Sequence, residues 1–358
     1  MTSPLVLSLD AMGGDHAPKV VVDGVVAFLK GRKRKVRFLL HGDETLLKPL
    51  VDGHPGLTEV CEIRHTESQV DMSAKPSEAV RRSRGSSMWN AVEAIRNGEA
   101  HVAVSAGNTG ALMAISKVIL RMKKGVHRPA IAASWPGPKG FTTVLDVGAN
   151  VECPPAQLVE FAIMGEAFHR ALHGVDRPTV GLLNVGQEEL KGNGIVRDAD
   201  ALLRAAGLDM DYQGFVEGND ISLGKTHVVV TDGFTGNVAL KTAEGTARLV
   251  AGWVREALTS SLIAKFAAAL LQLGALDQLR AKMDPNNVNG GVFLGLNGVV
   301  VKSHGGTDAA GFATALRIAL EMADSAFLNE IERNLSLLAA VNTAEADAAG
   351  ASREEMTA

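Results

Sequence analysis

A strand, a glycine loop and the start of a helix occur twice in this chain, and the repeat limits the folds that the chain can adopt. The first copy reads HVAVSAGNTGALM from His101, and the second reads HVVVTDGFTGNVALK from His227. The copies match without a gap, so Gly110 corresponds to Gly236. In each copy, small and β-branched residues predict a buried strand, and helix formers follow the glycines. The repeat therefore predicts two related halves built on one plan.

Each glycine loop leads into the N-terminus of a predicted helix, a position that suits an anion. Free backbone N–H groups and the positive end of the helix dipole meet there, and a threonine hydroxyl adds a donor. We interpret the loops as sites for phosphate or a developing oxyanion that face a shared cleft. A tight strand-to-helix turn that merely needs glycine is the alternative. The residues concerned are Gly107, Asn108, Thr109, Gly110, Gly233, Thr235, Gly236 and Asn237.

Predicted strands alternate with predicted helices along the 358 residues, which favours an α/β fold with a largely parallel sheet. Hydrophobic residues make up 46% of the chain and charged residues 21%, a globular profile with enough core for two subdomains. Polar residues follow the predicted strands, and we expect them to line one edge of the sheet, where α/β folds place ligands. They are Asp10, Ser105, Asp146, Asn184, Thr231 and Ser303.

Composition argues against several classes of function. The net charge of −4 gives no sign of a nucleic-acid partner, and Cys61 and Cys153 form neither a disulfide framework nor a metal-binding spacing. We expect no signal peptide and no membrane-spanning helix, hence a cytoplasmic protein. The loop after the first strand, DAMGGD at 10–15, lacks the spacing of a dinucleotide fingerprint. We therefore expect no cofactor and no metal.

Three basic features are candidate anion or partner sites. Arg81, Arg82 and Arg84 precede Ser86 and Ser87, and together they form either an anion cradle or an ordinary helix end. Lys191 follows an acidic pair and precedes a glycine, which indicates an anion clamp or a surface ion pair. The basic run at 31–37 is either a docking patch for an acidic partner or a solvated loop. Asp10 and Asp15 orient a catalytic group or cap the next helix.

An apolar segment at about 260–283 predicts a helical hairpin. Apolar side chains repeat there at i and i+4, and the segment is too short to span a bilayer. Dimer core, an acyl-chain shelter, an interfacial helix and ordinary core packing remain open. The residues that define this surface are Leu262, Ile263, Phe266, Leu270 and Leu271. Residues 341–358 are small and charged, and we expect them to be disordered.

Several motifs, in order along residues 5–324, resemble the bacterial phosphate acyltransferase (PlsX) family. They are DAMGGD at 10–15, SSM at 86–88, SAGNTGAL at 105–112, GLLNVG at 181–186, KGN at 191–193, DGFTGN at 232–237 and KSHG at 302–305. The resemblance implies transfer of a fatty acyl group from acyl carrier protein to inorganic phosphate, which forms acyl phosphate for phospholipid synthesis.

The resemblance also implies a fold and partners. The fold is a three-layer α/β/α sandwich like that of isocitrate and isopropylmalate dehydrogenases, with residues 1–340 forming one catalytic unit of two intertwined subdomains. The implied assembly is a homodimer in peripheral contact with the membrane surface. A membrane glycerol-3-phosphate acyltransferase would take the product.

The expected mechanism needs no protein nucleophile, and no Ser-His-Asp order, GxSxG or HExxH motif is present. Phosphate attacks the thioester carbonyl, and N–H, Asn or Thr groups stabilise the oxyanion. His304 or Lys302 assists the leaving thiol. The predicted catalytic residues are Asp10, Asn108, Lys191, Asn237 and His304. The predicted phosphate ligands are Gly13, Gly14, Ser86, Ser87, Gly107, Thr109, Gly110, Gly233, Thr235 and Gly236.

Two other functions are alternatives. An NAD-dependent decarboxylating dehydrogenase on the same fold needs a metal-binding Asp cluster and an adenosine-reading segment, and neither is evident. A non-enzymatic carrier-protein-binding scaffold leaves the polar strand ends without a role.

Overall fold

The computed structural model describes residues 4–30, 35–261, 289–324 and 327–336. They form one sheet of 11 strands in the order β3-β2-β1-β4-β11-β10-β5-β6-β9-β7-β8. The strands are β1 (Leu5–Asp10), β2 (Val36–Gly42), β3 (Cys61–His65), β4 (Val102–Ser105), β5 (Ala130–Gly137), β6 (Gly140–Leu145), β7 (Thr179–Leu183), β8 (Asp211–Val216), β9 (Val228–Val230), β10 (Gly291–Leu294) and β11 (Val299–Lys302).

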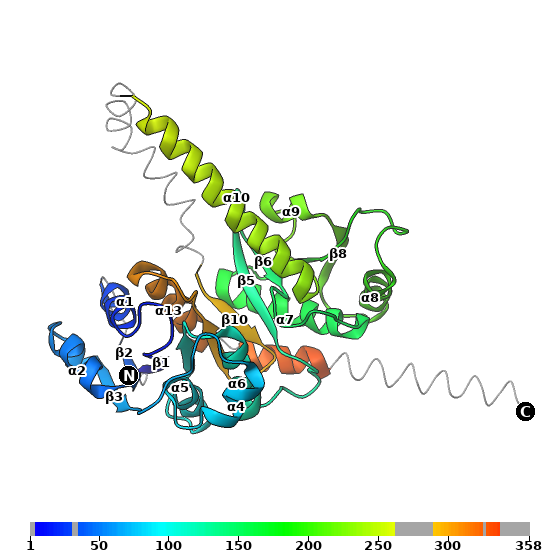
Figure 1. Ribbon diagram of the computed structural model, residues 1–358. Helices are drawn as coiled ribbons and strands as arrows, with labels where there is room; N and C mark the ends of the chain where they lie inside the picture. The colour runs from blue at the N-terminus through cyan, green and yellow to red at the C-terminus, as the bar shows by residue number, and fades with distance from the viewer. Residues whose placement is uncertain (1–3, 31–34, 262–288, 325–326, 337–358) are drawn as a thin grey trace, which may run out of the picture.

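Helices pack on both faces of this sheet (Figure 1). They are α1 (Lys19–Leu29), α2 (Glu44–Asp52), α3 (Leu57–Val60), α4 (Pro76–Arg82), α5 (Ser87–Arg96), α6 (Thr109–Leu120), α7 (Pro155–His173), α8 (Gly194–Ala205), α9 (Gly218–Leu223), α10 (Gly233–Thr259) and α13 (Ala309–Asp324). One core cluster joins the sheet to α1, α2, α7, α8 and α13, and a second joins it to α5, α6 and α9. The predicted three-layer α/β/α fold is confirmed.

The C-terminal segment returns to the first half of the chain. β11 pairs in parallel with β4, and α13 packs on α1, where Gly24 leaves room for the ring of Phe312. A Cβ atom at Gly24 would lie 2.8 Å from that ring, so this close helix approach requires glycine. Both ends of the described chain therefore contribute to one half of the fold.

The two copies of the repeat are observed as β4 with α6 and β9 with α10, but they point in opposite directions. β1, β4 and β11 are parallel, whereas β10 is antiparallel to both β11 and β5. The β5–β6 hairpin then reverses the chain, and β9 and β7 follow β6. The carboxyl ends of β1, β4 and β11 form what we call the Asp10 end of the sheet. Those of β6, β9 and β7 form the opposite, Asp146 end.

This reversal corrects one sequence-based prediction. The six polar strand ends do not line one edge: Asp146, Asn184 and Thr231 lie at the other end of the sheet from the rest. The two glycine loops likewise lie at opposite ends and do not face each other across one edge. The physical reason is the antiparallel β5–β6 hairpin, which alternation of strands and helices does not reveal.

Helix α10 connects the two ends. Its 27 residues span about 40 Å, roughly twice the length of a six-residue strand. It starts at the Asp146 end, and its far half projects beyond the sheet (Figure 1). Among the described residues, no helix combines the length and apolar character needed to cross a membrane. The predicted hairpin surface of Leu262, Ile263, Phe266, Leu270 and Leu271, and the 341–358 tail, lie outside the described residues.

Candidate active site

Asp10 ends strand β1, and its carboxyl group is the buried centre of the Asp10 end. The register places Asp10 beside Ser105 of β4. Ser105 Oγ donates to Asp10 Oδ2 at 2.6 Å and accepts from the N–H of Gly107 at 3.0 Å. A Cβ atom at Gly13 would lie 2.4 Å from Asp10 Oδ2, so glycine is needed where this loop crosses the carboxylate.

Burial raises the pKa of Asp10, and the hydroxyl groups of Ser105 and Ser87 oppose this rise. Ser87 Oγ lies close enough to affect the carboxyl group, although it is buried and makes no well-formed hydrogen bond within the described chain. Neighbouring Ser86 caps α5, with its Oγ accepting from the N–H of Trp89 at 3.3 Å. Of the two predicted serines, Ser87 is therefore the one that borders Asp10.

Lys302 ends strand β11 and lies next to Ser105 in the sheet. Its Nζ donates to the carbonyl oxygen of Ala106 at 3.2 Å and to that of Ser303. Burial lowers the pKa of Lys302 to about 8, with Asp10 and Asp15 opposing the shift and Lys241 adding to it. The loop that follows touches the Asp10–Asp15 loop, where the N–H of Asp15 donates to Gly305 O at 2.9 Å.

Asn289 holds the end of β11 in place, a role that the sequence did not reveal. Its buried amide donates to Ser303 Oγ at 2.8 Å and to Thr307 Oγ1 at 3.0 Å, and its Oδ1 accepts from the N–H of His304 at 2.9 Å. The only signal was its place before Gly290-Gly291, at the start of an apolar strand. Its partners are distant in sequence, so the network needs the fold.

The middle of α10 adds charge to the Asp10 end, although its first turn lies at the Asp146 end. Burial is the main cause that lowers the pKa of His304, and Lys241 and Lys302 lower it further. Glu244 opposes this shift and pairs with Lys241 at 2.9 Å. Arg248 lies 3.6 Å from the same Glu244. Residues of both halves therefore meet near His304.

The first glycine loop joins the Asp10 end through α6. Asn108 caps this helix, with Oδ1 accepting from the N–H of Ala111 at 2.9 Å. Its amide nitrogen donates to Met72 O at 2.7 Å and Ala74 O at 3.1 Å, so both amide hydrogens are used inside the protein. Within the described chain, the first-turn N–H groups of Thr109 and Gly110 have no acceptor, so these two helix donors are left for a ligand.

The second glycine loop packs on a different carboxylate, that of Asp146. Backbone N–H groups of Ile131, Gly148, Ala149 and Asn150 donate to it, and so does the side-chain amide of Asn150. A Cβ atom at Gly233 would lie 2.7 Å from Asp146 Oδ2, and one at Gly236 would lie 1.9 Å from its backbone oxygen. These glycines are therefore needed for packing.

The remaining predicted residues of the second half lie apart from Asp10. Thr235 bonds Asp232 through both its N–H, at 2.7 Å, and its hydroxyl, at 2.9 Å. Asn237 is exposed beside Gly148. Lys191 is exposed on the loop after β7, and its ammonium makes no ion pair within the described chain. The structure thus brings together Asp10, Gly13, Gly14, Ser87, Gly107 and His304, and it separates Lys191, Gly233, Thr235, Gly236 and Asn237 from them.

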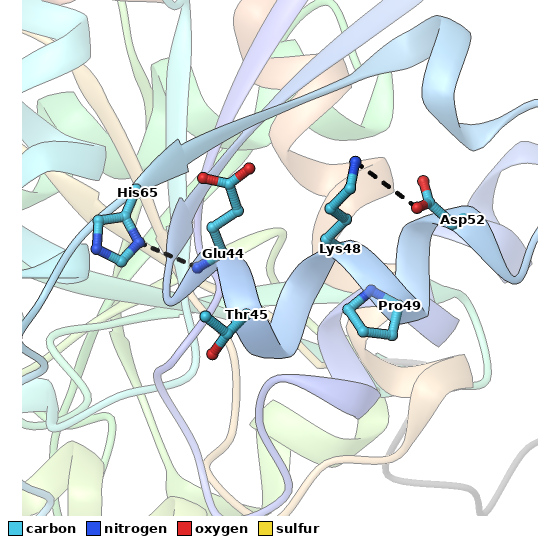
Figure 2. Close-up of a pocket in the computed structure, with 6 residues that line it drawn as sticks. All are labelled: Glu44, Thr45, Lys48, Pro49, Asp52 and His65. Atoms are coloured by element: carbon cyan, nitrogen blue, oxygen red, sulfur yellow. Dashed lines mark hydrogen bonds and ion pairs between the residues drawn. The ribbon is translucent and has the colours of Figure 1, made fainter.

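Two surface hollows lie outside this cluster. The first, of about 580 Å³, lies on α2 at the ends of β2 and β3, where His65 accepts from the N–H of Glu44 at 3.1 Å (Figure 2). Lys48 and Asp52 form an ion pair of 3.7 Å on its rim. Its polar groups pair with one another and point to no ligand.

The second hollow, of about 600 Å³, is an apolar groove between α9, α10 and Trp135. It lies on the side of α10 that faces away from Lys241. Its α10 wall consists of Ala239, Thr242, Ala243, Thr246, Ala247 and Val250. We call it the α10 groove.

Comparison with known proteins agrees with this architecture. A family model described as "Fatty acid synthesis protein" matches residues 5–330. Phosphate acyltransferase of Maricaulis maris is 66% identical over 350 residues, covering 98% of this chain and 100% of that protein. Phosphate acyltransferase of Caulobacter vibrioides is 58% identical, covering 96% of this chain and 95% of that protein.

Solved structures at low sequence identity show the fold alone. A phosphotransacetylase from Streptococcus pyogenes superposes with a TM-score of 0.61 at 16% identity, covering 89% of this chain and 94% of that one. A 4-hydroxythreonine-4-phosphate dehydrogenase from Klebsiella pneumoniae gives 0.53 at 13% identity, covering 90% of this chain and all of that one. With the family match over nearly its whole length, the chain belongs to the fatty acid synthesis protein family, among the phosphate acyltransferases.

Proposed function

We propose that this protein transfers a fatty acyl group from acyl carrier protein to inorganic phosphate at the Asp10 end of the sheet. Membership of the phosphate acyltransferase family makes it an acyltransferase of lipid synthesis that uses phosphate as the acceptor. The carrier protein, the partners and the residues that act are our proposal. The observation that carries it is the partly buried Lys302 beside Asp10, Ser105 and the N-terminus of α6.

The charges at this end suit a phosphate dianion that acts as the nucleophile. The α6 N-terminus offers the N–H groups of Thr109 and Gly110 and the positive end of its dipole. Lys302 supplies a fixed cation one strand away. Of the two hydroxyl groups beside Asp10, that of Ser105 already donates to the carboxylate, and that of Ser87 is buried. The nucleophile is therefore the bound phosphate.

The reaction follows from these groups. A phosphate oxygen attacks the thioester carbonyl carbon, and the resulting oxyanion accepts hydrogen bonds from the free N–H groups. The tetrahedral intermediate collapses, the carbon–sulfur bond breaks, and its electron pair leaves on sulfur. The products are acyl phosphate and the thiol of the carrier. Phosphate loses one proton and sulfur gains one, so the protons balance.

We assign carrier docking to Arg81, Arg82 and Arg84. All three are exposed, and they precede Ser86 and Ser87, the latter beside Asp10. A carrier protein held there by its acidic surface would bring its thioester to the Asp10 end. Arg82 pairs with Glu78 at 2.7 Å, and Arg37 of the other basic run pairs with Glu62 at 3.3 Å, whereas Arg81 and Arg84 make no ion pair within the described chain. Residues 31–34 of that other run lie outside the described chain.

We assign a second copy of this chain to a face of α10 other than the α10 groove. This face exposes large apolar side chains on one helical stripe, as a homodimer contact would require. They are Phe234, Val238, Leu249 and Trp253. Product release at the membrane surface, to a membrane glycerol-3-phosphate acyltransferase, completes the proposal.

The deciding experiment mixes the purified protein with palmitoyl acyl carrier protein and phosphate. We expect acyl phosphate, trapped as a hydroxamate, in proportion to the carrier thiol released. Release of free fatty acid without acyl phosphate would contradict the proposal. Binding of the carrier without turnover would favour the scaffold function, and NADH formation with a hydroxy acid would favour the dehydrogenase.

A further inference from the structure

The ammonium group of Lys302 has one hydrogen left for a ligand. A lysine ammonium carries three hydrogens, and Lys302 uses two of them on the carbonyl oxygens of Ala106 and Ser303. Among the residues that the structure describes, neither Asp10 nor Asp15 lies within ion-pair distance of it. The two carbonyl contacts fix the head group, and the third N–H is available at the end of the strand.

Other groups near the site are less suited to give up a proton. His304 Nδ1 accepts from the N–H of Gly306 at 3.2 Å, and its lowered pKa keeps the ring neutral at pH 7. Ser105 donates its hydrogen to Asp10. Lys241 pairs with Glu244 at 2.9 Å. Lys302 is therefore the cation here whose proton is not committed to a carboxylate.

We propose that the Lys302 ammonium is the acid that protonates the leaving thiolate. The inference rests on the proposed function and names the residue that completes it. As the carbon–sulfur bond breaks, sulfur takes the bonding electron pair and a proton from Nζ. The neutral amine then takes the proton that the attacking hydrogen phosphate must lose. One proton thus moves from phosphate to thiol, and Lys302 ends each cycle as it began.

The acidity of the site suits this task. General acids work best when their pKa lies near the operating pH, and alkyl thiols such as cysteine titrate near 8.5. Burial lowers the pKa of Lys302 to about 8, so it is charged at pH 7 and yet gives up its proton readily. The anchor on Ala106 O holds it beside the Ser105–Gly107 turn, where the carbonyl carbon would be attacked.

The test varies how much the leaving group needs a proton. Cleavage of palmitoyl pantetheine releases an alkyl thiolate, which is a strong base. Cleavage of S-phenyl thiopalmitate releases an aryl thiolate, a far weaker base that needs no proton to leave. We expect Lys302→Met to lower kcat/KM for the alkyl thioester about 10²–10⁴-fold, the usual contribution of general acid catalysis. The loss with the aryl thioester should be less than roughly tenfold. Equal losses with both would overturn the proposal.

Variants that keep the charge or change the neighbour complete the test. Lys302→Arg keeps a cation that does not titrate, so it should show the same selective loss as Lys302→Met if proton transfer matters. His304→Gln should keep the wild-type ratio of alkyl to aryl rates. If His304→Gln changes that ratio and Lys302→Met does not, the acid is His304 and our assignment is wrong.

A pH profile with palmitoyl acyl carrier protein gives a readout that does not depend on the small thioesters. In the wild type, kcat/KM should fall as the pH rises through about 8, because Lys302 loses its proton. This fall should vanish in Lys302→Arg, and its persistence would overturn the assignment. If the wild type forms no acyl phosphate from any thioester, the proposed function fails instead.

Discussion

Asp10 and Asp146 occupy matching places in the two halves but have different surroundings. Each is buried at the end of a strand that pairs in parallel with the strand of a glycine loop. Asp146 accepts hydrogen bonds from four backbone N–H groups and from the Asn150 amide. Asp10 accepts one short bond from Ser105 and one of 3.4 Å from the N–H of Met12.

The difference indicates that the two copies of the repeated motif have different roles. The Asp146 carboxylate already accepts several hydrogen bonds from nearby N–H groups. It therefore holds the loop in place and has few free lone pairs for a ligand. The Asp10 carboxylate has few internal donors and lies near the cation Lys302. A buried carboxylate with few internal partners costs stability, and such sites are commonly functional. We therefore expect stability to depend on the Asp146 end and turnover on the Asp10 end.

The sharpest test makes the same substitution at both carboxylates. Asp146→Asn places an NH₂ group against N–H donors, and each buried donor left unpaired costs about 1–3 kcal/mol. We expect it to lower the free energy of unfolding by about 3 kcal/mol or more, measured by urea denaturation. Asp10→Asn should change unfolding by less than about 1.5 kcal/mol, because the amide oxygen still accepts from Ser105.

For turnover we expect the opposite ranking, with Asp10→Asn having the larger effect and Asp146→Asn the smaller. Asp10 raises the pKa of Lys302, so Asp10→Asn should shift the alkaline fall of kcat/KM to lower pH. Folded Asp146→Asn, assayed below its melting temperature, should keep the wild-type profile. A stable Asp146→Asn protein with a shifted profile would break the comparison.

Glycine substitutions probe the two loops. A Cβ atom at Gly236 would overlap the backbone oxygen of Asp146 at 1.9 Å, whereas one at Gly107 would meet the flexible end of Met88 at 2.5 Å. Backbone yields less easily than a methionine side chain. We expect Gly236→Ala to destabilise by about 1–3 kcal/mol and Gly107→Ala by less, as thermal unfolding would report. Equal melting temperatures would contradict the packing argument.

Acid sensitivity should come mainly from the second half. Burial lowers the pKa of His169 to about 3 and that of His173 to about 4, and the nearby His227 adds to both shifts. Unfolded histidine binds a proton below about pH 6.5, whereas these two do not until the pH nears 4 or 3. The unfolded state therefore binds more protons in this window, and stability should fall as the pH drops from about 6.5.

Urea unfolding at pH 7, 6, 5 and 4 measures this slope. Thr143 Oγ1 lies 2.9 Å from His169 Nδ1, so His169→Asn would remove a titrating group from a polar contact. Its stability should depend less on pH than that of the wild type. His41 in the first half, with a pKa lowered to about 4, accounts for a remaining slope.

The smallest effect concerns carrier docking. Arg81→Glu with Arg84→Glu should raise KM for acyl carrier protein severalfold, because exposed charge pairs contribute roughly 0.2–1 kcal/mol each. Salt should weaken the effect, and KM for phosphate should stay unchanged. Arg197→Glu, an exposed change on α8 near the Asp146 end, is the matched control. An equal rise in both variants would show that the effect is not local.

Much of the fold was readable because its signals are local. Alternation of strands and helices predicted an α/β fold, the family resemblance implied its three layers, and the repeat predicted β4 with α6 and β9 with α10. Asp10, Gly107 and His304 were predicted because polar and glycine residues follow apolar strands, and the structure places them at one end of the sheet, but their catalytic and binding roles stay predictions. The same holds for Asn108, Lys191 and Asn237, and the amide of Asn108 is already used as a helix cap.

The sequence by itself determined the strands, the glycine turns and the family motifs, because each is set by residues close together in the chain. Only the tertiary structure decided which strand ends meet, because the β5–β6 hairpin reverses the direction of the strands that follow β6 in the sheet, and because β11 inserts beside β4, which is distant in sequence. It also decided that the middle of α10 reaches His304 and that Asn289 holds the β11 end. Burial then distinguishes two aspartates that look alike in sequence: one is saturated by backbone donors, and the other lies near a lysine cation.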